Sequence, residues 1–93
     1  MQFEWDEPKN RQNIKKHGIS FEEAQTVFFD SLAKVAQDPD HSRGEARFIA
    51  IDHSSVSRLL LVVHCFREDT SVVRIISARK LTKTEKRQYE EGL

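Results

Sequence analysis

Cysteine, glycine and proline are scarce in this sequence of 93 residues, which contains one Cys, three Gly and two Pro. The single cysteine, Cys65, excludes an intrachain disulfide and a cysteine-based zinc site, and its apolar neighbours indicate that it is buried. The glycines stand far apart, so no glycine-rich phosphate loop is present. No apolar run approaches the roughly 18 residues that span a membrane, and the N-terminus lacks a signal peptide's basic and apolar regions. We therefore expect a cytoplasmic protein without membrane contact.

An excess of either charge is also absent, because 15 Lys and Arg side chains balance 15 Asp and Glu side chains. The charges are unevenly distributed, however. Residues 21–40 contain one basic and five acidic side chains, a net charge of −4, whereas residues 41–80 contain seven basic and four acidic ones, a net charge of +3. This polarity is compatible with one face that binds an anionic ligand. The length allows one modest core, so we expect a single domain over residues 1–93.

The most apolar part of the sequence predicts a β-hairpin. Residues 59–66 and 72–78 are rich in aliphatic and β-branched side chains, and residues 67–71 between them have turn chemistry. Neither apolar run alternates with polar residues, so both faces of these strands should be largely covered. Arg74 interrupts the second run, and its guanidinium is costly to bury unless it is paired or faces a cleft.

The remaining segments predict an α+β fold. Ser20 and Glu23 match a capping box, as do Thr82 and Glu85. The expected strands cover residues 2–5, 32–36 and 47–51 beside the hairpin, and the expected helices cover about residues 7–16, 20–30 and 82–91. This order is β-α-α-β-β-β-β-α, an antiparallel sheet with two N-terminal helices and one C-terminal helix. An apolar stripe should place the second helix on the sheet: Phe21, Ala24, Val27 and Phe28.

The first helix has a thin apolar face, with polar Asn10, Asn13 and His17 at helical spacing beside Ile14. One interpretation is a solvated amphipathic helix whose Asn and His side chains cap neighbouring backbone. The other is a helix at the rim of a functional site. The same helix ends at Gly18, which suits a left-handed C-cap.

Acid–base and cationic side chains gather in the second half of the sequence. They are His41, Glu45, Arg47, Arg74, Arg79, Lys80, Lys86 and Tyr89. Metal-free cleavage of RNA needs a base for the 2′-hydroxyl, a cation for the phosphorane and an acid for the 5′-oxygen, and arginine suits the second task. Strand-end arginines and paired glutamates are also ordinary surface features. The histidines show no metal-ligand spacing, so we expect neither a metal site nor a cofactor.

Four motifs, in order along the chain, resemble those of the BrnT toxin family. They are Trp5-Asp6; Lys16-His17-Gly18-Ile19-Ser20-Phe21-Glu22-Glu23-Ala24; Asp38-Pro39-Asp40-His41-Ser42 with Gly44-Glu45 and Arg47; and Arg74-Ile75-Ile76-Ser77-Ala78-Arg79 with Glu85, Arg87, Tyr89 and Glu90. The sequence departs from the family at Asp52, where a glycine is expected in many relatives.

The resemblance implies a RelE-like fold and a metal-independent endoribonuclease toxin that inhibits translation. It also implies neutralisation by a BrnA-type antitoxin with a ribbon-helix-helix DNA-binding domain, which alone would contact operator DNA. The functional residues it implies are His41, Glu45, Arg47, Arg74, Arg79 and Tyr89 for catalysis and Lys80, Lys86 and Arg87 for RNA binding. The alternative is a non-catalytic subunit that acts with its DNA-binding partner as an autorepressor.

Overall fold

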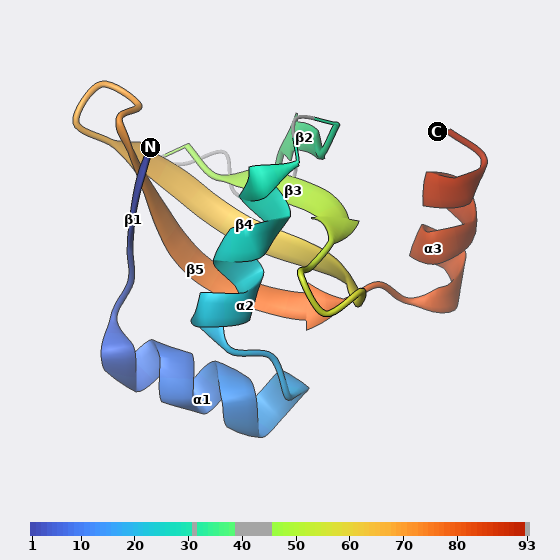
Figure 1. The fold of residues 1–93 in the computed structure, drawn as a ribbon, viewed down its shortest axis with the longest axis horizontal. Coiled ribbons are helices and arrows are strands. Elements are labelled where there is room, and N and C mark those ends of the chain that lie inside the picture. Colours follow the sequence, from blue (N-terminus) through green and yellow to red (C-terminus); the bar gives the residue numbers. More distant parts are fainter. Residues whose placement is uncertain (31, 39–45, 93) are drawn as a thin grey trace.

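The computed structural model describes residues 1–30, 32–38 and 46–92 of the chain, which form one five-stranded sheet and its helices (Figure 1). The elements are β1 (Gln2–Glu4), α1 (Glu7–His17), α2 (Phe21–Gln25), the 3-10 helix η1 (Thr26–Phe29), β2 (Lys34–Gln37), β3 (Phe48–His53), β4 (Leu59–Arg67), β5 (Val72–Lys80) and α3 (Lys83–Glu90). The predicted α+β order is confirmed, with η1 as the continuation of the second helix.

The strands lie in the order β1-β5-β4-β3-β2. The four strands from β2 to β5 are antiparallel, as expected, and the predicted hairpin is the centre of the sheet. β1 joins the edge in parallel to β5, with Phe3 opposite Val73. A strand's side-chain alternation reports which faces it presents and not its direction, so the sequence carried no signal for this one parallel pair.

The core lies between the sheet and the N-terminal helices, and α2 crosses the sheet in Figure 1. Phe21, Ala24 and Val27 are completely buried, as the apolar stripe predicted, while Phe28 is half-buried and packs at the margin of the core. The facing residues of the sheet are also buried: Ala50, Leu60, Val62, Val73, Ile75 and Ala78. We refer to this side of the sheet as the helix face.

Glu23 takes part in the cap of α2 and also binds two residues of the β3–β4 connection. The Ser20 hydroxyl accepts a hydrogen bond from the Glu23 backbone N–H at 3.0 Å, which begins α2. The Glu23 carboxylate does not return to the Ser20 backbone, because it accepts hydrogen bonds from Arg58 Nε at 2.9 Å and from the Ser54 hydroxyl at 2.7 Å. The bond with Arg58 is the main reason why the pKa of Glu23 is lowered. Glu23 therefore ties the β3–β4 connection to α2.

Two buried asparagines explain the thin apolar face of α1. Asn13 Nδ2 donates to the carbonyls of Ile19 and Ala78, both at 2.8 Å, and its Oδ1 accepts from the Ala78 N–H at 3.1 Å. Asn10 Oδ1 accepts from the Phe21 N–H at 2.8 Å. The backbone-capping interpretation is therefore confirmed for the two asparagines, although they are buried and not solvated as that interpretation had it. Gly18, with φ of 72°, is the left-handed C-cap.

Replacing Asn13 should destabilise the fold, because Asn13→Ala leaves a strand carbonyl, a strand N–H and a loop carbonyl buried without partners. We expect the free energy of unfolding to fall by roughly 3 kcal/mol, since each buried unsatisfied group costs about 1–3 kcal/mol. Urea unfolding measures this loss. The matched control is Gln12→Ala at the neighbouring exposed position, which should change stability by less than about 0.5 kcal/mol. Equal stabilities of the two variants would contradict this role of Asn13.

Candidate active site

The face of the sheet opposite α1 and α2 carries the candidate site, and we call it the open face. Side chains alternate between the two faces, so Leu61 lies on the open face with its cross-strand partners Ile51 and Arg79. Ile49 and Ile51 remain partly exposed there, whereas Leu61 and Cys65 are buried. The expectation that both faces of the hairpin are largely covered holds for most of β4, whereas Arg74, Ile76, Ser77 and Arg79 of β5 remain partly exposed.

A β-bulge places both predicted strand arginines on this face. Arg74 and Arg79 are five residues apart, and in a regular strand this odd spacing would put them on opposite faces. The register shifts between Val63 and His64, with one extra residue in β5, so that Arg74 lies opposite Cys65 and Arg79 opposite Leu61. Cys65 and Leu61 are on the same face of the regular strand β4, so the two guanidinium groups are as well. Bulges often re-aim side chains beside active sites.

Arg79 is held by a carboxylate from α3. Its Nη1 and Nη2 donate to the two carboxylate oxygens of Glu85 at 2.7 and 2.9 Å. Glu85 also accepts the Thr82 backbone N–H at 2.9 Å, which completes the predicted capping box of α3. The Arg79 hydrogen bonds are the largest cause that lowers the pKa of Glu85 to about 2. The fork of Arg79 is thus presented in the bidentate geometry that a phosphate would require.

Arg74 is also ion-paired, at the other end of β5. Its Nη1 donates to Glu4 Oε2 at 2.6 Å, and Arg67 Nε lies 3.4 Å from the same oxygen. From the sequence, Arg74 was expected to be paired or to face a cleft, and the structure shows that it is paired. Arg74 therefore ties β1 to β5 across the parallel edge.

Tyr89 projects from α3 toward the end of β3. Its hydroxyl donates to Asp52 Oδ1 at 3.5 Å, and Lys34 Nζ lies 4.8 Å from its ring centroid. Burial, followed by the nearby Asp52 carboxylate, raises the pKa of Tyr89. A pocket of about 170 Å³ separates α3 from the open face, and its lining includes Tyr89 and Glu85. The remaining lining residues are Lys34, Ile49, Ile51, Leu61 and Gln88.

The other predicted residues fall in three places. Lys80 and Lys86 line a second pocket, and Arg87 is exposed on α3. Arg47 directly precedes β3 and is half-buried, and its carbonyl accepts the Asp38 N–H at 2.8 Å. His41 and Glu45 lie outside the described residues. The described structure therefore brings Arg79 and Tyr89 to one pocket region and places Arg74 apart from them on the same face.

Sequence reasoning missed the acidic side chains that organise this region. Glu85 was recognised as a capping residue and as part of a family motif but not as the partner of Arg79, and Glu4 was not considered as the partner of Arg74. Asp52 is buried at the end of β3, where Oδ1 accepts the His53 N–H at 2.7 Å. A carboxylate at the end of an apolar strand was the available signal for Asp52.

His64 is a core residue and not a site residue. It is completely buried on the helix face, with its ring centroid 4.8 Å from that of Phe28. Burial lowers its pKa, so the imidazole is neutral at pH 7. Among the described residues, no group of three or more His, Cys, Asp or Glu side chains is arranged to hold a metal ion. Within the same part of the chain, no helix has the length and apolar character to cross a membrane.

Comparison with known proteins identifies the family of the chain. Residues 5–85 match the family model of BrnT, the ribonuclease toxin of type II toxin-antitoxin systems. The chain belongs to the BrnT family. A crystal structure of the Brucella abortus ribonuclease toxin BrnT is similar at 26% sequence identity and a TM-score of 0.67, covering 89% of this chain and 99% of that one. A search among curated proteins found no match.

The family match establishes that the chain is a ribonuclease toxin, but the matched residues do not include the whole candidate site. A BrnT-family member is a ribonuclease toxin, and its type II system implies an antitoxin partner. Arg74, Arg79 and Lys80 lie within the matched residues, whereas Lys86 and Tyr89 lie beyond residue 85. Most of α3 therefore lies beyond the residues that the family model matches.

The ion pair with Arg79 predicts an unusually acidic Glu85. The side-chain carboxyl should titrate near pH 2 in the folded protein, and Arg79→Gln should return it toward its ordinary value of 4.5. Because the folded pKa is the lower one, the pair stabilises α3 fully above about pH 4.5 and loses this contribution as the pH falls toward 2. A carbon NMR titration of the glutamate carboxyls measures both values. A wild-type Glu85 that titrates near pH 4.5 would show that the pair does not persist in solution.

Proposed function

We propose that this BrnT-family chain is an endoribonuclease that cleaves RNA without a metal ion, inhibits translation in the cytoplasm and is neutralised by a BrnA-type antitoxin. The single observation that carries the proposal is the bidentate presentation of Arg79 on the open face, beside the pocket that Tyr89 lines. We propose that the antitoxin has a ribbon-helix-helix domain and that operator DNA is contacted only through it.

The chemistry assigns different tasks to the proposed residues. The Arg79 fork binds the scissile phosphate and stabilises the charge of the phosphorane, a task that a guanidinium performs without a metal ion. The Glu85 carboxylate occupies that fork in the described structure, and it stands where two phosphate oxygens would bind. RNA binding therefore displaces Glu85 from Arg79.

Proton transfer is assigned to side chains around this phosphate. The raised pKa of Tyr89 keeps the hydroxyl protonated at neutral pH, which suits a hydrogen-bond donor or an acid toward the 5′-oxygen. We propose His41 and Glu45 as candidates for the base that takes the 2′-hydroxyl proton. Arg47 and Arg74 bind further phosphate oxygens, and Lys80, Lys86 and Arg87 bind the RNA outside the cleaved step.

An EDTA experiment tests the metal-independent reaction. Purified chain incubated with RNA in excess EDTA should cleave it at the rate seen without EDTA, and the cognate antitoxin should abolish cleavage. Gel analysis of the RNA measures both rates. Cleavage that EDTA stops and added Mg²⁺ restores would contradict metal independence. A chain that never cleaves RNA, yet represses its own promoter together with the antitoxin, would instead establish the autorepressor alternative.

The role of the Arg79 fork predicts a large effect of a conservative change. Arg79→Lys keeps the charge but cannot form two parallel hydrogen bonds to a phosphate, so we expect cleavage to slow by roughly 100-fold, as when one transition-state donor is removed. Thermal unfolding should change little, because the Arg79–Glu85 pair is partly exposed. The control is Arg11→Lys on the exposed surface of α1, which should cleave at the wild-type rate. Wild-type cleavage by Arg79→Lys would remove Arg79 from the reaction.

A further inference from the structure

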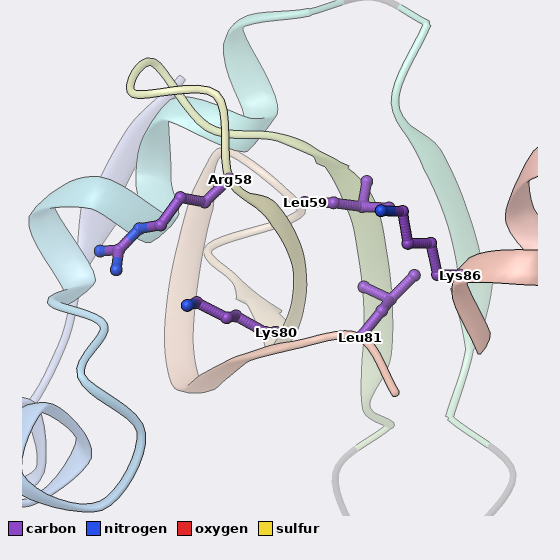
Figure 2. A pocket seen from close by; sticks show the side chains of 5 residues that line it. All are labelled: Arg58, Leu59, Lys80, Leu81 and Lys86. Atoms are coloured by element: carbon purple, nitrogen blue, oxygen red, sulfur yellow. The ribbon is translucent and has the colours of Figure 1, made fainter. Parts of the chain in front are cut away.

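A second pocket lies at the end of the central hairpin, between the β3–β4 connection and α3 (Figure 2). Its volume is about 270 Å³. Five residues line it: Arg58, Leu59, Lys80, Leu81 and Lys86. Three of the five are cationic and none is acidic, so the lining favours an anion.

The two lysines are the cations available to a ligand. Arg58 is engaged by the Glu23 carboxylate, which accepts hydrogen bonds from its Nε and Nη2, so this charge is already compensated. Lys80 and Lys86 are exposed, and neither forms an ion pair with another described residue. Lys80 lowers the pKa of Glu23 at longer range, as its second positive neighbour after Arg58. The pocket therefore retains a positive charge in the folded protein.

The lining combines two leucines with cationic side chains that lie on two sides of the pocket. Figure 2 shows Leu59, Leu81 and Lys86 close to one another, while Arg58 and Lys80 extend toward the opposite side. A nucleotide within a strand has an apolar base face and a phosphate on each side, whereas a free mononucleotide has one phosphate. The volume of about 270 Å³ is slightly below the range of about 300–1,000 Å³ that is usual for small-molecule pockets, so the pocket has room for one nucleotide unit at most and not for a base pair.

The pocket continues the proposed cleavage site. Lys80 follows Arg79 directly in β5, and Lys86 follows Glu85 directly in α3, so the two pairs of neighbours connect the Arg79–Glu85 contact with this pocket. Consecutive residues of a strand face opposite sides, which places Lys80 toward the helix face at the strand's end. An RNA strand bound on the open face therefore reaches the pocket by passing the ends of β4 and β5.

We propose that this pocket binds one unpaired nucleotide of a single-stranded RNA substrate, next to the cleaved step. The base lies against Leu59 and Leu81, and the flanking phosphates lie near Lys80 and Lys86. Cationic grooves with apolar or aromatic base platforms are the usual means of holding single strands. This inference rests on the proposed ribonuclease function, because it assigns the class of RNA that the same site accepts.

Binding of an RNA that cannot be cut tests the pocket separately from catalysis. The probe is a short single-stranded RNA with methylated 2′-hydroxyls, and its affinity is measured by fluorescence anisotropy across a series of salt concentrations. We expect Lys80→Gln/Lys86→Gln to weaken binding at least tenfold at low salt. Removing two phosphate contacts should also flatten the slope of log K against log salt by about 1.4, at about 0.7 per contact.

The matched control is Lys9→Gln/Lys15→Gln, which removes two exposed lysines of α1 and should bind as the wild type does. Equal affinity and slope for the two double variants would overturn the proposal. The proposal would also be overturned if Lys80→Gln/Lys86→Gln lost antitoxin binding but retained RNA binding. Duplex RNA or adenosine monophosphate that bound as tightly as the single strand would overturn it as well. A wild-type chain that binds the methylated RNA but cannot cut its unmodified form would overturn the proposed function and leave the pocket supported.

Discussion

The extra residue in β5 is the constraint on which the candidate site depends. Without the register shift opposite Val63 and His64, Arg74 and Arg79 would lie on opposite faces of the sheet. One of them would then point into the core beneath α2, where an unpaired guanidinium is strongly unfavourable. The bulge keeps Ile75 and Ala78 on the helix face and both arginines on the open face. This one bulge therefore keeps the core apolar and also places both arginines on the open face.

The elements could be predicted because their signals are local. The Thr82–Glu85 capping box, the stripe of α2 and the two apolar runs of the hairpin each depend on residues within one turn or one strand. The bulge could not be predicted in the same way. The slip in the period-2 pattern shows in the sequence only as the odd spacing between Arg74 and Arg79, because the aliphatic residues around them suit either face of the sheet. The parallel direction of β1 could not be predicted either, because the alternation of side chains over three residues does not indicate the direction of a strand.

Two carboxylate partners of the arginines, Glu4 and Glu23, were missed because they are distant in sequence. Glu4 is separated from Arg74 by 70 residues, and Glu23 from Arg58 by 35, so only the folded sheet brings each pair together. Glu23 is instructive, because its spacing from Ser20 matched a local motif while its carboxylate served a tertiary contact. Long-range pairing of this kind overrides a local preference when it also fixes a connection between strands. The cationic residues could be named from the sequence, but not which carboxylate each of them meets.

The weak attachment of α3 to the sheet makes the Arg79–Glu85 pair compatible with the proposed role of Arg79. α3 has no buried residue and stands apart from α1 and α2 in Figure 1. It meets the sheet through the Arg79–Glu85 ion pair, the Tyr89–Asp52 hydrogen bond and the contacts of the Tyr89 ring. Partly exposed ion pairs contribute only about 0–1 kcal/mol, so exchanging the Glu85 carboxylate for a phosphate costs little folding energy. In the proposed mechanism, a phosphodiester brings its own negative charge to Arg79 and leaves the Glu85 carboxylate free to move into solvent. The helix that covers the arginine is therefore also the element that the fold can most easily move.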